Sequence, residues 1–139
     1  MQPAPDARAL RSALLNYRTA WQAAGWLLIA AVVYFSLTPD PITMPVDNGD
    51  KYDHVLAYAV LMFWLAQLHR RGAARLRLAC AFILMGVALE FVQRMTGYRT
   101  FEMADMASGA LGVCAGWTLA PPRSPDVLGI LESRWPLRR

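Results

Sequence analysis

Polar residues with the potential for chemistry gather at three points of this sequence, each at the end of a long apolar run. They stand where the second run begins, where the third ends and where the fourth begins: Lys51 and His54, Glu90 and Gln93, and Asp105 and Ser108. Carboxylates, an imidazole and an ammonium group can together bind a hydroxylated or charged ligand, or transfer protons. Residues three positions apart share one face of a helix, so each pair can point the same way. We therefore expect the three pairs to meet in one pocket.

Four apolar runs are the elements that must position these residues. With 56% hydrophobic and 17% charged residues in 139, the chain is too apolar for an ordinary soluble surface. The runs predict an all-α integral membrane four-helix bundle over residues 20–120, with spans at about 20–38, 52–69, 76–94 and 103–120. The second and third runs hold only about 14 uncharged residues, or ~21 Å of helix against a hydrocarbon core of ~30 Å. Reaching full length therefore draws His54 and Glu90 below the headgroups, where polar side chains need partners.

Positively charged residues set the predicted orientation of the spans. They concentrate in segment 1–19, in the loop between the second and third spans, and in segment 121–139, whereas the first loop carries Lys51 among aspartates. Because short loops rich in Lys and Arg stay in the cytoplasm, both terminal segments are predicted to be cytoplasmic, an N-in/C-in topology. Both basic segments are also candidates for helices on the membrane surface. The polar pocket then opens at the opposite, outer face.

A purely structural interpretation of the polar residues stays open at this point. In that interpretation Glu90 pairs with Lys51 or Arg99, and Asp105 stabilises the amino end of the fourth helix. The sequence alone favours neither pairing over a ligand site.

The same residues limit what catalysis and which cofactors can be expected. Glu90 or His54 could act as a general base, but no nucleophile accompanies them, so a binding role is favoured and an enzyme is the alternative. No second His lies near His54, and Cys80 and Cys114 stand singly inside apolar runs, so we expect no metal site, no disulfide and no cofactor. The arginines form separate clusters rather than one amphipathic face, which argues against nucleic acid as a partner.

Small residues recur every four positions in the fourth run, at Ser108, Gly112 and Gly116. Such a ladder lets the backbone of another helix approach closely. We expect it to serve packing inside the bundle, with the seam of a homodimer as the alternative.

Five short motifs occur in order between about residues 30 and 120: Ser36-Leu37-Thr38-Pro39, Asp50-Lys51 with His54 and Tyr58, Glu90-Phe91-Val92-Gln93, Gly97-Tyr98-Arg99, and Asp105 with Gly109 and Gly112. Together they resemble the VanZ-like family. The resemblance implies a small multi-span membrane domain, in a family named for a protein linked to teicoplanin resistance. By matching position it adds Arg99 to the expected pocket. Ser108 departs from the family pattern, which has Asn there, and so lacks the paired donor and acceptor of an amide.

The pocket and the resemblance lead to one functional hypothesis. Lys51 and Arg99 would hold a phosphate or carboxylate, and the apolar helix faces would take an acyl chain. Glu90 and Asp105 would accept hydrogen bonds from sugars or amines. We expect a multi-pass protein of the bacterial cytoplasmic (inner) membrane that contacts membrane lipids and binds a lipoglycopeptide such as teicoplanin or a lipid-linked cell-envelope precursor. Such binding would contribute to glycopeptide resistance or envelope homeostasis.

Two other functional classes remain as alternatives. One is a membrane-embedded enzyme that acts on a lipid-linked phosphate or glycan with Glu90 and His54 as acid and base. The other is a small ion-coupled transporter, because buried carboxylates and a histidine can form a proton relay.

Overall fold

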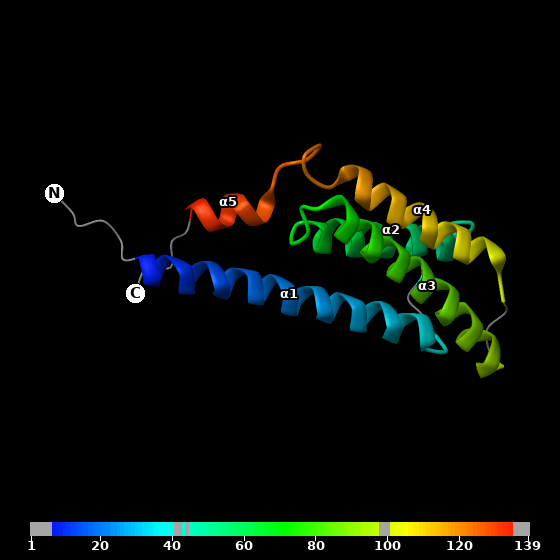
Figure 1. Cartoon of the computed structure of the whole chain (residues 1–139). Coiled ribbons are helices and arrows are strands. Elements are labelled where there is room, and N and C mark those ends of the chain that lie inside the picture. Colours follow the sequence, from blue (N-terminus) through cyan, green and yellow to red (C-terminus); the bar gives the residue numbers. More distant parts are fainter. Residues whose placement is uncertain (1–6, 41–42, 44, 98–100, 135–139) are drawn as a thin grey trace.

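Five helices account for the regular structure of the described residues. The computed structural model describes residues 7–40, 43, 45–97 and 101–134. The helices are α1 (Ala7–Leu37), α2 (Gly49–Ala66), α3 (Gly72–Thr96), α4 (Met103–Leu119) and α5 (Val127–Arg134) (Figure 1). The all-α prediction is therefore confirmed for this part of the chain. α1 runs without a break from Ala7 to Leu37, so one helix covers most of the predicted segment 1–19 and the first apolar run.

The four long helices alternate in direction along the chain. Trp21 of α1 stacks on Trp64 near the end of α2, so these two helices run antiparallel. At the opposite end of the molecule, Gln93 near the end of α3 donates a hydrogen bond to the Ser36 carbonyl oxygen of α1. The carboxyl ends of α1 and α3 and the amino ends of α2 and α4 therefore meet at one end of the bundle (Figure 1).

The most extensive contact joins α2 to α4, and glycines of α4 make it possible. A Cβ atom on Gly112 would overlap the carbonyl oxygen of Val55, and one on Gly116 would overlap that of Ala59. Gly112 and Gly116 are four residues apart on α4, and their partners Val55 and Ala59 are four residues apart, in the same order, on α2. The two helices therefore run parallel at this contact. Gly112 and Gly116 of the ladder predicted from the sequence thus lie against α2, inside this chain.

Arg75 closes the other end of the bundle. Its side chain is 8% exposed and donates to the carbonyl oxygens of Ala66, His69 and Pro121. These oxygens lie at or just after the ends of α2 and α4, where helical carbonyl groups lack partners within the helix. Arg75 therefore serves the fold, although its place among basic loop residues suggested only an orientation signal.

The segment after α4 returns to the bundle. Asp126 pairs with Arg70, which follows α2, and α5 packs on α1 (Figure 1). The predicted tail at 121–139 therefore contains a helix that contacts the protein itself, at the end where α1 begins.

Two helices, Tyr17–Leu37 of α1 and Gly72–Thr96 of α3, are long and apolar enough to cross a membrane. α2 and α4 have 18 and 17 residues, somewhat fewer than the ~20 of a typical span. The bundle also buries five polar side chains: Gln67, Arg75, Glu90, Gln93 and Asp105. Large apolar side chains are exposed on all four long helices.

Candidate functional site

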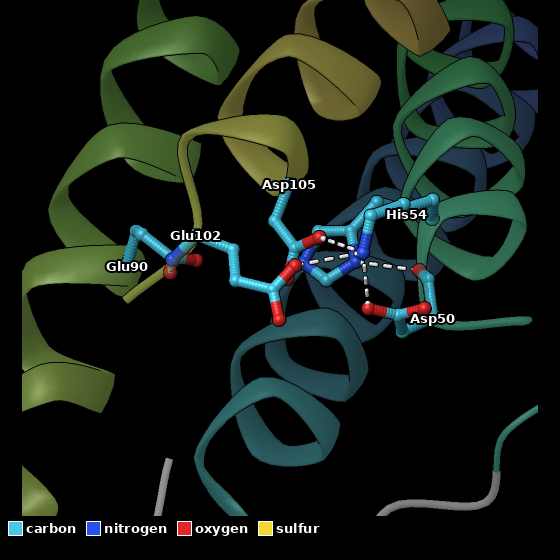
Figure 2. Close-up of polar contacts among 6 residues, drawn as sticks. Asp50, His54, Glu90, Glu102 and Asp105 are labelled. Atoms are coloured by element: carbon cyan, nitrogen blue, oxygen red, sulfur yellow. Dashed lines mark hydrogen bonds and ion pairs between the residues drawn. The ribbon is translucent and has the colours of Figure 1, made fainter. Parts of the chain in front are cut away.

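Six ionisable residues form a cluster at the end of the bundle where α2 and α4 begin. Asp50, Lys51 and His54 come from the first turns of α2, Glu90 comes from α3, Glu102 precedes α4 and Asp105 lies in its first turn (Figure 2). We call these six residues the polar cluster. They come from segments up to 55 residues apart, and the alternating helices bring these ends together.

Lys51 is at the centre of the cluster's ion pairs. Its Nζ atom lies 2.8 Å from Glu102 Oε2, 2.9 Å from Asp50 Oδ2 and 3.5 Å from Asp105 Oδ1 (Figure 2). Hydrogen bonds to Glu102, and then to Asp50, raise the pKa of Lys51 above its ordinary value. The hydrogen bond from Lys51 also holds the pKa of Asp50 below its ordinary value. This ammonium group is therefore neutralised by the protein's own carboxylates.

His54 faces the two buried acids of the cluster. Its Nδ1 atom lies 2.8 Å from the Asp50 carbonyl oxygen one turn earlier, so Nδ1 carries the proton and donates it. In the neutral form of the ring, the other nitrogen, Nε2, is the acceptor. Ligand atoms of His54, Glu90 and Asp105 all lie within 4.8 Å of one another. A base and two carboxylates thus converge from three different helices.

Glu90 and Asp105 are the least exposed acids of the cluster, at 2% and 8%. Glu90 Oε1 accepts a hydrogen bond of 2.5 Å from the backbone N–H of Glu102, which fastens the start of α4 to α3. Asp105 Oδ1 is buried and receives no hydrogen bond in the described part of the chain. The Lys51 ammonium group is near it at 3.5 Å, without the geometry of a hydrogen bond.

An apolar pocket of about 330 Å³ adjoins the cluster between α1 and α2. Its walls are mainly aliphatic and aromatic side chains, among them Leu28, Val32, Phe35, Leu56, Val60 and Leu61. Asp50, Asp53 and His54 line it as well, so its polar groups come from the first turns of α2. His54 is the residue shared by the pocket, the polar cluster and the predicted set.

The structure separates the predicted site residues into groups. Lys51, His54, Glu90 and Asp105 come together in the cluster. Gln93 points to α1 instead, with its Nε2 atom 2.7 Å from the Ser36 oxygen. Arg99 lies outside the described residues.

Ser108 lies one turn after Asp105 on α4 and is partly exposed. Glu102 was not predicted as a site residue, although its place three residues before Asp105 could have indicated it. The structural alternative paired Glu90 with Lys51 or Arg99, but Glu90 accepts a hydrogen bond from the Glu102 backbone N–H, and Lys51 pairs with other carboxylates. Asp105 does lie in the first turn of α4.

Comparisons with known proteins give little more than one distant relative. No family model matches the chain, and no solved structure matches it. An uncharacterized protein of Schizosaccharomyces pombe is 30% identical over 89 residues, which is 62% of this chain and 53% of that protein. The chain thus spans about half the length of the curated relative it matches. This similarity offers no support for a bacterial location.

Proposed function

We propose that this chain is a multi-span membrane protein that binds an amphiphile, with the apolar tail between α1 and α2 and the headgroup at the polar end of the pocket. The observation that carries this proposal is the pocket itself. Its walls are apolar along α1 and α2, and its polar groups are Asp50, Asp53 and His54. A site with one long apolar part and a few polar groups fits a ligand of the same construction.

The distribution of side chains supports a four-span bundle. Leu27, Leu56, Leu84 and Leu111, one on each long helix, are 72%, 53%, 67% and 65% exposed. Polar groups meanwhile lie inside the bundle. Apolar surface around a polar interior suits hydrocarbon as the surrounding medium and would be costly in water.

Charge supports the proposed orientation. Arg18, Arg70, Arg71 and Arg77 belong to the end opposite the polar cluster. Under the positive-inside rule this end is cytoplasmic, so the pocket opens toward the outer face. Both termini are then inside, and α5 lies with α1 at the cytoplasmic end.

The chemistry of the headgroup follows from the polar end of the pocket. Carboxylates and an imidazole Nε2 atom accept hydrogen bonds, so hydroxyl and amine groups are favoured there. Because Lys51 is already paired with three carboxylates, it does not supply a positive charge for a phosphate. A lipid-linked glycan or a lipoglycopeptide has the required donors and tail. The resemblance to the VanZ-like family favours teicoplanin as the probe.

Binding to protein in lipid nanodiscs tests this function. We expect teicoplanin, which carries an acyl chain, to bind and vancomycin, which lacks one, to bind at least 10-fold more weakly. Ala57→Phe fills the pocket and should abolish teicoplanin binding. Ala107→Phe is the matched control, because Ala107 is exposed on α4 and does not line the pocket.

A companion assay with a fluorescent polyprenyl-linked sugar covers the other ligand class. Tight binding of either probe that is lost in Ala57→Phe and kept in Ala107→Phe supports the proposal. The proposal is overturned if neither teicoplanin nor the polyprenyl-linked sugar binds. It is also overturned if each probe binds Ala57→Phe as tightly as Ala107→Phe.

An enzymatic role is the second candidate, favoured by the approach of His54 to Glu90 and Asp105 within 4.8 Å. His54 Nε2 could accept a proton from water while a neighbouring carboxylate stabilises the imidazolium that forms. Release of phosphate from a polyprenyl phosphate, lost in His54→Gln and Glu90→Gln, would favour this candidate over binding alone.

A further inference from the structure

We infer that His54, Glu90 and Asp105 form a binding site for a divalent transition-metal ion, with Zn²⁺ as the preferred ion. One imidazole and two carboxylates is a donor set that Zn²⁺ accepts, and such sites commonly keep a further position for water. The three donors come from α2, α3 and α4, so an ion there would tie three helices together. The expectation from sequence was that no metal binds, because no second His stands near His54.

The separation of the donor atoms suits coordination. All three ligand atoms lie within 4.8 Å of one another. Donors that each bind Zn²⁺ at about 2.0–2.2 Å can be at most ~4.4 Å apart, so small side-chain rotations suffice to close the site. The buried positions of Glu90 and Asp105 keep bulk water from competing for those donors.

One ring nitrogen of His54 is already occupied by a hydrogen bond. Its Nδ1–H donates to the Asp50 carbonyl oxygen at 2.8 Å, so Nε2 is the nitrogen that remains for a metal ion. Metal-binding histidines commonly have their second nitrogen fixed in this way by a backbone carbonyl or a carboxylate. His69 makes the same bond, from Nδ1 to the Leu65 oxygen at 2.9 Å, but belongs to no such group of acids in the described residues.

A buried carboxylate oxygen of the site still lacks a hydrogen bond. Asp105 is 8% exposed, and its buried Oδ1 atom receives no hydrogen bond within the described ranges. A buried carboxylate oxygen without a hydrogen-bond donor is costly. Lys51, whose Nζ atom lies 3.5 Å away, offsets this cost only in part, and a bound metal ion would offset the rest.

Charge balance points the same way. The polar cluster holds four carboxylates, those of Asp50, Glu90, Glu102 and Asp105, against one ammonium group, that of Lys51. Four carboxyl groups thus share one ammonium group, and a divalent cation would offset part of this excess of acidic groups. Lys51 lies closest to Glu102 and Asp50 and 3.5 Å from Asp105, so one ammonium group is shared among three carboxylates.

Zinc binding to the purified full chain in detergent tests this inference and requires no amphiphile, so it can fail or succeed independently of the proposed function. The background carries Cys80→Ser and Cys114→Ser, because both thiols are exposed and would bind Zn²⁺ themselves. We expect one Zn²⁺ per chain by competition with a fluorescent chelator. His54→Gln and Asp105→Asn should each weaken Zn²⁺ binding by about 100-fold or more. Loss of a residue that only orients a metal ligand already costs about 10- to 100-fold, and these two residues bind the metal directly. His69→Gln, the matched control, should leave it unchanged.

A Co²⁺ spectrum gives a second readout. The background protein should show visible absorption of a low-symmetry, tetrahedral or five-coordinate site, and His54→Gln should lose it while circular dichroism shows the same helix content. If Asp105→Asn does not fold, Glu90→Gln and His54→Gln still decide the matter. Absence of stoichiometric Zn²⁺ in the background protein, or equal binding in His54→Gln and His69→Gln, would overturn the inference.

Discussion

Trp21 and Trp64 contact each other both by ring stacking and by reciprocal hydrogen bonds. Their rings stack with centroids 3.8 Å apart and planes within 6°, and each Nε1–H donates to the other residue's backbone carbonyl oxygen at 2.9 Å. This reciprocal pair joins α1 to α2 at the end opposite the polar cluster. The apolar pocket lies between the same two helices.

Replacing Trp64 with Phe should therefore loosen α1. The ring contact is kept in part, but one hydrogen bond and some stacking area are lost, at a cost of about 1–2 kcal/mol. Unfolding in a mixed detergent series measures the change. Trp26→Phe, at an exposed position on α1, should have almost no effect. Equal effects of the two changes would show that the pair does not hold the helices together.

The contact between α2 and α4 depends on the absence of side chains at Gly112 and Gly116. Gly116→Ala places a methyl group against the backbone of α2 at Ala59, so the helices must separate, which should cost about 1–3 kcal/mol. Gly72→Ala is the control, since nothing lies within 4 Å of a Cβ atom there. If Gly116→Ala instead leaves the unfolding midpoint unchanged and alters only self-association on a sizing column, the ladder serves a dimer.

Arg75 should matter far more than its basic neighbours. Arg75→Met leaves three carbonyl oxygens at the ends of α2 and α4 without their charged donor, a loss of about 2–3 kcal/mol. Arg77→Met removes the same charge from an exposed position and should be nearly neutral for stability. Thermal unfolding of both variants distinguishes a structural arginine from an orientation signal. If Arg75→Met and Arg77→Met lose membrane insertion equally and do not differ in stability, Arg75 acts only through its positive charge.

The ion pairs of Lys51 predict a dependence of stability on pH. The pKa of Asp50 is lowered by its bond to Lys51, so this pair stabilises the fold above the unfolded value of about 4 and loses that contribution as pH falls further. The difference in melting temperature between the wild type and Lys51→Gln should be largest near pH 6 and should shrink toward pH 3. Lys51→Arg, which keeps the charge, should show a smaller difference at pH 6. A gap that is constant with pH would contradict this account.

The helical nature of the chain and the meeting of its polar residues could be predicted from sequence because both follow from local patterns. Apolar runs of helical length fixed where α1 to α4 lie, and a chain of alternating helices must bring the start of α2 to the end of α3 and the start of α4. His54, Glu90 and Asp105 were therefore expected in one place. Gln93 was also expected there, but its side chain donates a hydrogen bond to the Ser36 carbonyl oxygen of α1 instead. Residues three positions apart on a helix point about 60° away from each other, so their spacing does not give them the same partner.

What the sequence by itself determined is the set of elements and the end of the molecule that carries the polar groups, since hydropathy and charge act along the chain. Only the tertiary structure decided which partners each group has. It paired Lys51 with Glu102, fifty-one residues away, buried Arg75 among carbonyl oxygens, and turned His54 toward Glu90 and Asp105 with its Nδ1 atom committed to Asp50. Such pairings depend on helix rotation and on close approach at Gly112 and Gly116, which are properties of packing between segments distant in sequence.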